Sequence, residues 1–269
     1  MLACGRSLSG SDAGQARLAG RVWLVRFACL LAIGAGFATA SARAVETYRG
    51  EARSQAGAPV LYTESHWVDG DRHVVLYACP DGRAFARKRL DLSRGATAPD
   101  FAVEDGRDGY RQGVRSEGDR RVVYVRAAGS APERTATLDR LPVIDAGFDA
   151  FVREHWDRLA AGSALPMRFL VPSRLKAMSF EVRQVRAGDG RRTFRLSLGS
   201  LLGRLLPAID VDYDAHSRRL LGYRGLTDVR DGHGGLVTAE IRFPPEAYGR
   251  EQRSIASAVS APLDGRCRL

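Results

Sequence analysis

The stretch MSFEVRQVRAGDGRRTFRLSL, residues 178–198, decides the fold class of this chain. Apolar residues alternate with polar ones in both of its halves: Met178, Phe180 and Val182, then Phe194, Leu196 and Leu198. A period of two is typical of a strand with one apolar face. The sequence AGDG at 187–190 predicts a hairpin turn, so the stretch indicates two antiparallel strands.

Similar strands are predicted through most of the chain. The alternation recurs cleanly at 209–214 and 237–243. It recurs less cleanly in the first half, at 48–53, 60–67, 73–79, 83–92, 110–115, 121–126 and 133–138. Short strands separated by Gly, Asp and Pro predict a mainly β (α+β) fold. We expect an antiparallel meander that forms a curved sheet or an unclosed half-barrel.

One segment between the two groups of strands has helical spacing instead. Its apolar residues are Phe148, Phe151, Val152, Trp156 and Leu159. Asp145 is placed to cap the start, and Gly162 is placed to end the helix in a left-handed turn. We predict one long amphipathic helix over 145–162 that covers the apolar face of the sheet, because such a face must be buried.

An export signal is predicted near the start of the chain. An uncharged stretch runs from 27 to 42 between Arg26 and Arg43. The small residues Ala42 and Ala44 around Arg43 are those expected at a cleavage site. The stretch is shorter and less apolar than a membrane span, so a cleaved signal is favoured over an uncleaved anchor. We expect residues 1–44 to be removed, 45–249 to form one domain and 250–269 to form a polar tail. The periplasm of a Gram-negative bacterium is the expected location.

The charge of the chain is basic but unspecific. Five arginines and one aspartate leave with residues 1–44, so the formal net charge falls from +10 to +6. Nearly all of the excess is arginine, which fits a GC-rich genome, and no nucleic-acid partner is expected. The basic run Arg83, Arg87, Lys88 and Arg89 predicts a solvated strand face.

Two cysteines, Cys79 and Cys267, remain after cleavage. An oxidising compartment favours a disulfide between two such thiols. Sequence gives no distance between them, so both the paired and the free state stay open.

The order of strands, helix and strands behind an export signal, with the phrases VDYD at 211–214 and RLLGYRGL at 219–226, resembles the periplasmic lipoprotein-carrier and receptor superfamily. It is also similar to uncharacterised exported bacterial proteins of that shape. In that superfamily an unclosed half-barrel with helical cover encloses an apolar cavity. The resemblance implies this architecture.

No motif fixes a chemistry. Asp210, Asp212 and Asp214 share a strand face, but a calcium loop would need Gly at 215 and Glu at 221. His155 or His66, working with an aspartate, is the candidate base of a secreted hydrolase. No metal, cofactor or catalytic residue is assigned.

The favoured hypothesis is a non-enzymatic periplasmic protein that binds a small apolar or lipid-like ligand between sheet and helix. A cell-envelope scaffold that binds a protein partner and the hydrolase are the alternatives. The expected ligand wall consists of large apolar residues: Tyr62, Trp156, Phe169, Phe180, Phe194, Leu201, Leu202, Leu205, Leu206 and Tyr213.

Overall fold

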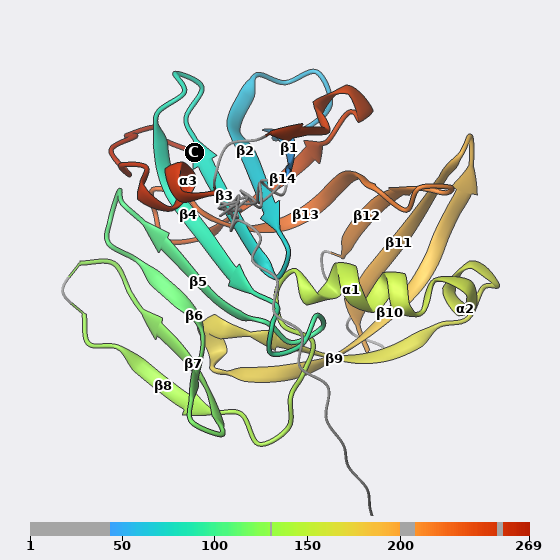
Figure 1. The fold of residues 1–269 in the computed structure, drawn as a ribbon, viewed down its shortest axis with the longest axis horizontal. Coiled ribbons are helices and arrows are strands. Elements are labelled where there is room, and N and C mark those ends of the chain that lie inside the picture. Colours follow the sequence, from blue (N-terminus) through green and yellow to red (C-terminus); the bar gives the residue numbers. More distant parts are fainter. Residues whose placement is uncertain (1–43, 130, 200–207, 252–254) are drawn as a thin grey trace, which may run out of the picture. The chain divides into compact units, whose positions relative to one another are not determined.

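The computed structural model describes residues 44–129, 131–199, 208–251 and 255–269. The described strands form one antiparallel sheet of 15 strands, which confirms the predicted mainly β class (Figure 1). Consecutive strands pair with each other along two meanders, as predicted; the exceptions are the connection between the two meanders and the last, short strand.

The first half of the chain forms an eight-stranded meander. Its strands are β1 (Val45–Arg53), β2 (Val60–Asp69), β3 (Arg72–Ala78), β4 (Ala84–Asp91), β5 (Asp100–Asp105), β6 (Arg111–Glu117), β7 (Arg120–Arg126) and β8 (Arg134–Thr137). The second meander has β9 (Leu165–Val171), β10 (Lys176–Gly188), β11 (Arg191–Leu198), β12 (Ile209–Asp214), β13 (Leu220–Arg230) and β14 (Leu236–Arg242). Strand β14 pairs with β1 and so joins the two meanders into one sheet.

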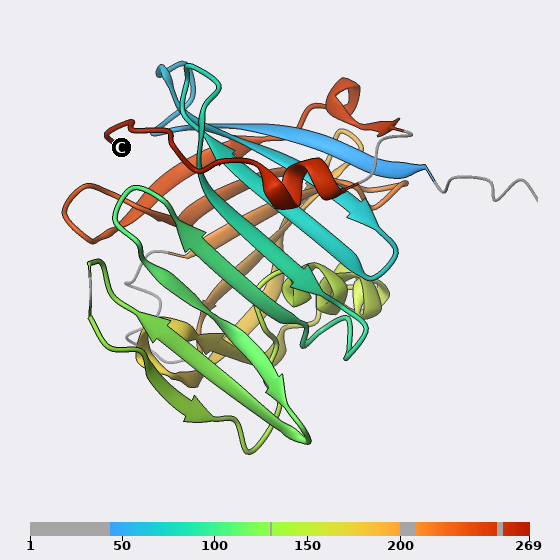
Figure 2. The same ribbon diagram turned by 60° about the vertical axis from the view of Figure 1, so that its left-hand side comes forward.

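The two outer strands of this sheet, β8 and β9, are consecutive in the chain, and the sheet is rolled until they approach each other (Figure 2). Val143, in the connection, forms a parallel bridge with Phe169 of β9. Leu170 of β9 packs against a cluster that includes Phe101 and Val123, from β5 and β7. Side-chain packing therefore holds the two edges of the rolled sheet together. The described residues of β8 and β9 do not pair with each other, so the sheet is not a closed barrel.

Two short helices, α1 (Gly147–Glu154) and α2 (Trp156–Ala160), stand where the sequence predicts one long helix, so that prediction is wrong. The break is at His155, whose φ of −103° and ψ of 15° leave the helical range. Its Nδ1 atom lies 3.0 Å from the carbonyl oxygen of Phe151, which also accepts the backbone N–H of His155. One carbonyl oxygen thus contacts both the backbone and the side chain of His155 at the break.

The helix ends also differ from expectation in one respect. Asp145 has a φ of 49°, and α1 begins after it with no side-chain cap. The carboxylate of Asp145 instead accepts from the N–H of Ala146 and from Lys88. Gly162 has a φ of 91°, the left-handed conformation that the sequence predicts.

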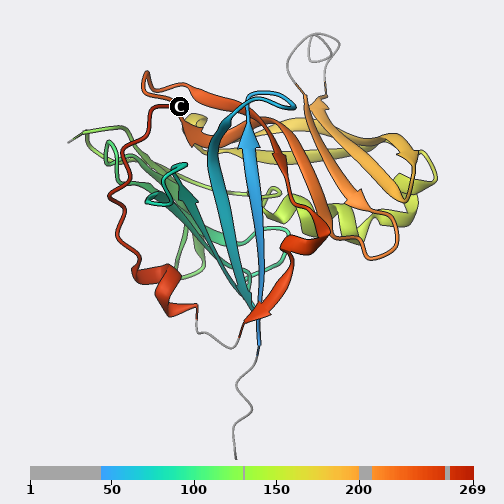
Figure 3. The ribbon, with the colours of Figure 1, turned by 90° about the horizontal axis from the view of Figure 1, so that it is seen from above.

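The C-terminal segment packs along the first meander (Figure 3). It contains β15 (Gly249–Glu251), which pairs with β1, and α3 (Ala256–Ser260). Ile255 and Ala258 pack against Val74 of β3. Cys267 forms a disulfide with Cys79 at the end of β3, with their Cα atoms 5.6 Å apart.

Candidate functional site on the inner face of the sheet

The inner face of the rolled sheet, the face toward α1 and α2, brings together three of the predicted wall residues. Trp156 of α2 contacts Phe194 and Tyr213 edge to face, with ring centroids 5.2 and 5.9 Å away. All three side chains are buried in one cluster with Val152 and Leu159 of the helices. Here the rings pack as a core between helix and sheet.

Two other predicted wall residues remain partly exposed on the same face. Phe169 of β9 and Phe180 of β10 pack edge to face with centroids 5.9 Å apart. Together with Ile209 and Tyr223 they are half-buried against the helix-covered cluster. We call these four residues the inner apolar strip.

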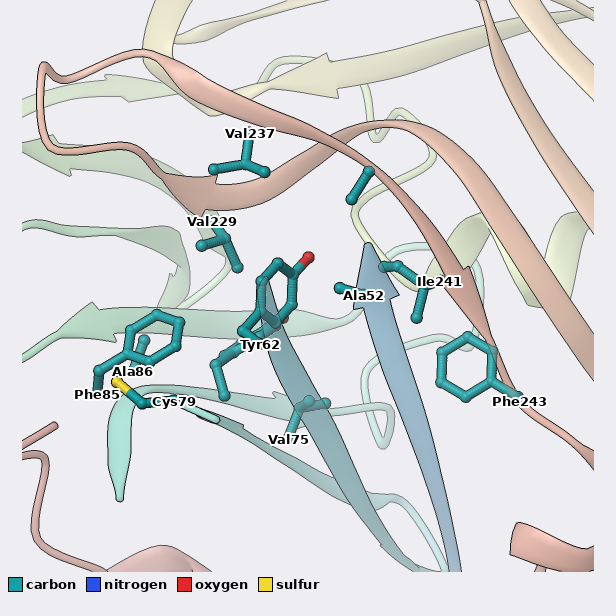
Figure 4. Close-up of a cluster of buried hydrophobic side chains, with 12 residues drawn as sticks. Ala52, Tyr62, Val75, Cys79, Phe85, Ala86, Val229, Val237, Ile241 and Phe243 are labelled. Atoms are coloured by element: carbon teal, nitrogen blue, oxygen red, sulfur yellow. The ribbon is translucent and has the colours of Figure 1, made fainter. Parts of the chain in front are cut away.

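Tyr62 lies apart from both groups. It belongs to a second cluster, built from β1 to β4 with β13 and β14, where Ala52 and Val229 are its neighbours in the cluster (Figure 4). The ring is fully buried, and its hydroxyl has no hydrogen-bond partner among the described residues. The remaining predicted wall residues lie outside the described residues: Leu201, Leu202, Leu205 and Leu206.

A buried charge cluster crosses the interior beside these apolar groups. The ammonium of Lys88 on β4 forms ion pairs with Asp145, at 2.9 Å, and with Asp228 of β13. Only 8% of Lys88 and 9% of Arg87 is exposed, so the prediction that the basic run is a solvated strand face is wrong for these two residues. The pairs tie β4 to the start of α1 and to β13.

The surroundings set the charges of this cluster. Burial alone lowers the pKa of Lys88, but the carboxylates of Asp145 and Asp228 outweigh burial and hold that pKa well above its ordinary value. Burial raises the pKa of Asp145 to about 6, against the opposing pull of Lys88. Lys88 is therefore charged at neutral pH and compensates the carboxylates around it.

A chain of three polar side chains lies next to Lys88. His66 contacts Glu64 through Nε2, at 3.2 Å, and His73 through Nδ1, at 3.0 Å, while Tyr48 stacks on its ring. Burial raises the pKa of Glu64 to about 7 and lowers that of His66 to about 3. Burial also lowers the pKa of His73, so both rings are neutral and each has one N–H to donate.

Both candidate histidines of the hydrolase alternative have partners in the described part of the chain. The histidine nitrogens of His66 contact a carboxyl group and another ring, and His155 contacts a backbone carbonyl. No hydroxyl or thiol of a described residue forms a hydrogen bond with either ring, as a base and its nucleophile would. The geometry gives these two residues packing and hydrogen-bonding roles.

The outer face carries the predicted row of aspartates. Asp210 accepts two bonds from the Arg195 guanidinium, at 2.6 and 2.8 Å, and Asp212 accepts from the Thr193 hydroxyl at 2.6 Å. Within the described part of the chain, no three His, Cys, Asp or Glu side chains are grouped to hold a metal ion. In the same part, no helix has the length and apolar character needed to cross a membrane.

No family model and no curated protein matches the chain. A solved structure with a similar arrangement is the crystal structure of a β-barrel-like protein of domain of unknown function DUF1849 from Brucella abortus. Its TM-score is 0.43 and its sequence identity 9%, and the match covers 75% of this chain and 95% of that chain. The resemblance to lipoprotein carriers and receptors stays a prediction.

Sequence reasoning missed the charge cluster, although one signal for it exists. Lys88 stands between Ala86 and Leu90 in the period-two register of β4, and both of those residues are buried. A lysine in the apolar register of a strand is a candidate for a buried charge. Its partners Asp145 and Asp228 are 57 and 140 residues away, and no local pattern identifies them.

Proposed function

We propose that this protein is a non-enzymatic binding protein of the bacterial cell envelope, and that its inner apolar strip binds a small apolar or lipid-like ligand. One observation carries the proposal. The strip residues Phe169, Phe180, Ile209 and Tyr223 stay half-buried although they adjoin a fully packed core. Covering apolar surface of this kind stabilises a complex by about 25 cal/mol per Å².

The packed cluster behind the strip supports its use as a binding surface. Phe194 and Val182 are fully buried, so the strands that present the strip are fixed by their own core. A rigid apolar wall needs little ordering when a ligand arrives, which favours affinity. The predicted contribution of the four leucines between 200 and 207 stays a prediction.

The charge cluster supports an amphiphilic rather than a purely hydrocarbon ligand. Tyr223 belongs to the strip, and burial raises its pKa with a further contribution from the carboxylate of Asp228. Asp228 is on the same strand as Tyr223 and its side chain is 38% exposed, which offers a polar group to one end of a ligand. Ligand sites of this composition are mostly apolar with a few polar groups that orient the ligand.

The proposed location is the periplasm. The apolar stretch at 27–42 supports export, because its length and flanks are those of a cleaved signal. The Cys79–Cys267 disulfide supports an oxidising compartment, where such bonds persist.

Titration with N-phenyl-1-naphthylamine, an uncharged apolar fluorophore, tests the proposal. We expect the purified protein to bind the probe and Phe180→Ser to weaken that binding about tenfold, through lost apolar contact. Val185→Ser is the matched control, since Val185 lies on the same strand and is 39% exposed. No probe binding, or equal weakening by both variants in proteins with unchanged circular dichroism, would overturn the proposal.

A further inference from the structure

A second feature lies on the outer face, where β10 to β14, β1 and the segment 244–247 after β14 surround a hollow of about 840 Å³. Six arginines line it: Arg49, Arg53, Arg186, Arg191, Arg224 and Arg242. Four carboxylates also line it: Glu51, Asp212, Glu240 and Glu246. We call it the arginine hollow. Its volume lies in the range of about 300–1,000 Å³ that is common for small-molecule sites.

A glycine forms part of the floor of the arginine hollow. Gly222 of β13 pairs with Asp212 of β12 on one side and with Arg242 of β14 on the other. The neighbouring strands present the polar side chains of Asp212 and Arg242 at these positions, whereas Gly222 has no side chain. The missing side chain leaves space between the two flanking rows.

Half of the arginines are already paired with carboxylates. Arg53 binds Glu51 at 2.8 Å, and Arg242 binds Glu240 at 2.7 Å. Arg224 lies 3.9 Å from Glu240, and also 3.9 Å from Asp210 beside the hollow. These pairs neutralise two of the four carboxylates in the lining.

The other three guanidinium groups, those of Arg49, Arg186 and Arg191, form no ion pair or side-chain hydrogen bond with a described residue. Of the remaining carboxylates, Asp212 accepts the Thr193 hydroxyl and Glu246 is exposed. The lining therefore has six cations against four anions, and three of the cations have donors free for a ligand.

We propose that the arginine hollow binds a phosphate group, carried either by a small soluble molecule or by a lipid headgroup. A guanidinium offers a planar fork of donors that matches phosphate oxygens. A phosphate monoester carries about −1.5 to −2 charge at neutral pH. Such a ligand matches several free guanidinium groups better than a ligand with a single carboxylate would. This site is on the opposite face from the inner apolar strip and does not depend on it.

Calorimetric titration with inorganic pyrophosphate at low ionic strength tests the soluble source. We expect binding, and we expect the triple variant Arg49→Gln, Arg186→Gln, Arg191→Gln to weaken it at least about tenfold. Flotation with phosphatidylglycerol vesicles, against phosphatidylcholine vesicles, tests the lipid source. Loss of phosphatidylglycerol binding in the triple variant assigns the headgroup as the ligand.

A matched triple variant removes the same charge elsewhere: Arg140→Gln, Arg158→Gln and Arg174→Gln. These arginines are exposed, are not part of the hollow and form no ion pair with a described residue. We expect this variant to bind as the unmodified protein does. Equal weakening by both triple variants would show unspecific electrostatic attraction and overturn the proposal, as would the absence of binding in both assays.

A steric variant tests the hollow without changing its charge. A Cβ atom at Gly222 would lie 3.3 Å from Asp212 Oδ2, and a small shift of that side chain accommodates it. Gly222→Gln therefore places a neutral side chain on the floor of the hollow. We expect it to weaken binding at least about fivefold with circular dichroism unchanged. Unchanged affinity in folded Gly222→Gln would contradict a ligand seated in the hollow.

Discussion

The two meanders bury very different side chains on the same inner face. In β10 to β12 that face is apolar, with Val182, Phe194 and Val211 packed beneath α1 and α2. In β2 to β4 it carries Glu64 and Lys88 within a similar interior. One half is thus stabilised by apolar packing, which needs no particular partner. The other half has apolar clusters of its own but also depends on paired charges, because an unpaired charge in the interior is costly.

The disulfide gives the largest expected difference between the two halves, because it ties the C-terminal segment to the first meander. Removing it with Cys79→Ser and Cys267→Ser should lower the free energy of unfolding by about 4–5 kcal/mol, since the bond spans a long loop. Hydrogen exchange should accelerate first in β3, β4 and α3. The same pattern is expected for the unmodified protein after chemical reduction.

If amides of β10 to β12 lost protection as early as those of β3 and β4, the two halves would unfold as one unit. The two halves would then differ in their buried side chains but not in their stability.

The next largest effect concerns Lys88. Lys88→Ala should cost about 3–5 kcal/mol of unfolding free energy at pH 8, because Asp145 and Asp228 lose their compensating charge. The loss should be smaller at pH 5, because burial raises the pKa of Asp145 to about 6 and a protonated Asp145 no longer needs the charge of Lys88. Urea denaturation at both pH values measures this. Lys176→Ala is the control, since it removes an exposed lysine; a similar cost there would refute the buried-pair account.

An apolar truncation in the helix-covered half should behave differently. Leu159 is fully buried between α2 and the sheet, and Leu159→Ala should cost about 3 kcal/mol through lost packing and a residual cavity. This loss should be the same at pH 5 and pH 8. Leu141→Ala, at a site that is 55% exposed, should change stability little. A strong pH dependence of the stability loss in Leu159→Ala would contradict the claim that Leu159 stabilises the protein by apolar packing alone.

The smallest effect is the pH dependence that Glu64 contributes. Its folded pKa of about 7 is above the unfolded value of 4.5, so the folded state holds the proton more tightly. Glu64 therefore lowers stability as pH rises from about 5 to 8, by roughly 2 kcal/mol. Glu64→Gln should gain stability relative to the unmodified protein over that interval. His66 and His73 are present in both proteins, so the difference between their pH profiles of unfolding free energy reports the contribution of Glu64.

The opposite slope would contradict this reading. If Glu64→Gln lost stability relative to the unmodified protein between pH 5 and pH 8, Glu64 would be stabilised as a carboxylate. Its contact with His66 would then be an ion pair and not a bond between neutral groups.

Sequence alone predicts β10, β11, β12 and β14 well, because these strands alternate cleanly and their apolar residues face a core. Phe194 and Val182 follow the period of two and are buried. It misses β9, where Pro166 argues against a strand, and β5, a short strand of six residues. Proline is tolerated in β9 because that strand lies at the edge of the sheet.

The charge cluster could not be predicted in the same way. Lys88 breaks the apolar period of β4, and its two carboxylate partners come from distant parts of the chain. Only the rolled sheet brings them together. The break of the helix lies in the backbone angles of His155, which the spacing of apolar residues does not specify.

Native mass spectrometry of the freshly purified, exported protein tests the central claim most directly. The inner apolar strip predicts a population with added mass that dissociates as a lipid-like molecule on mild activation, reduced in Phe180→Ser and retained in Val185→Ser. A spectrum showing only the bare chain, together with no uptake of added fatty acid or phospholipid, would contradict the account. The strip residues would then only border the hydrophobic core and bind no ligand.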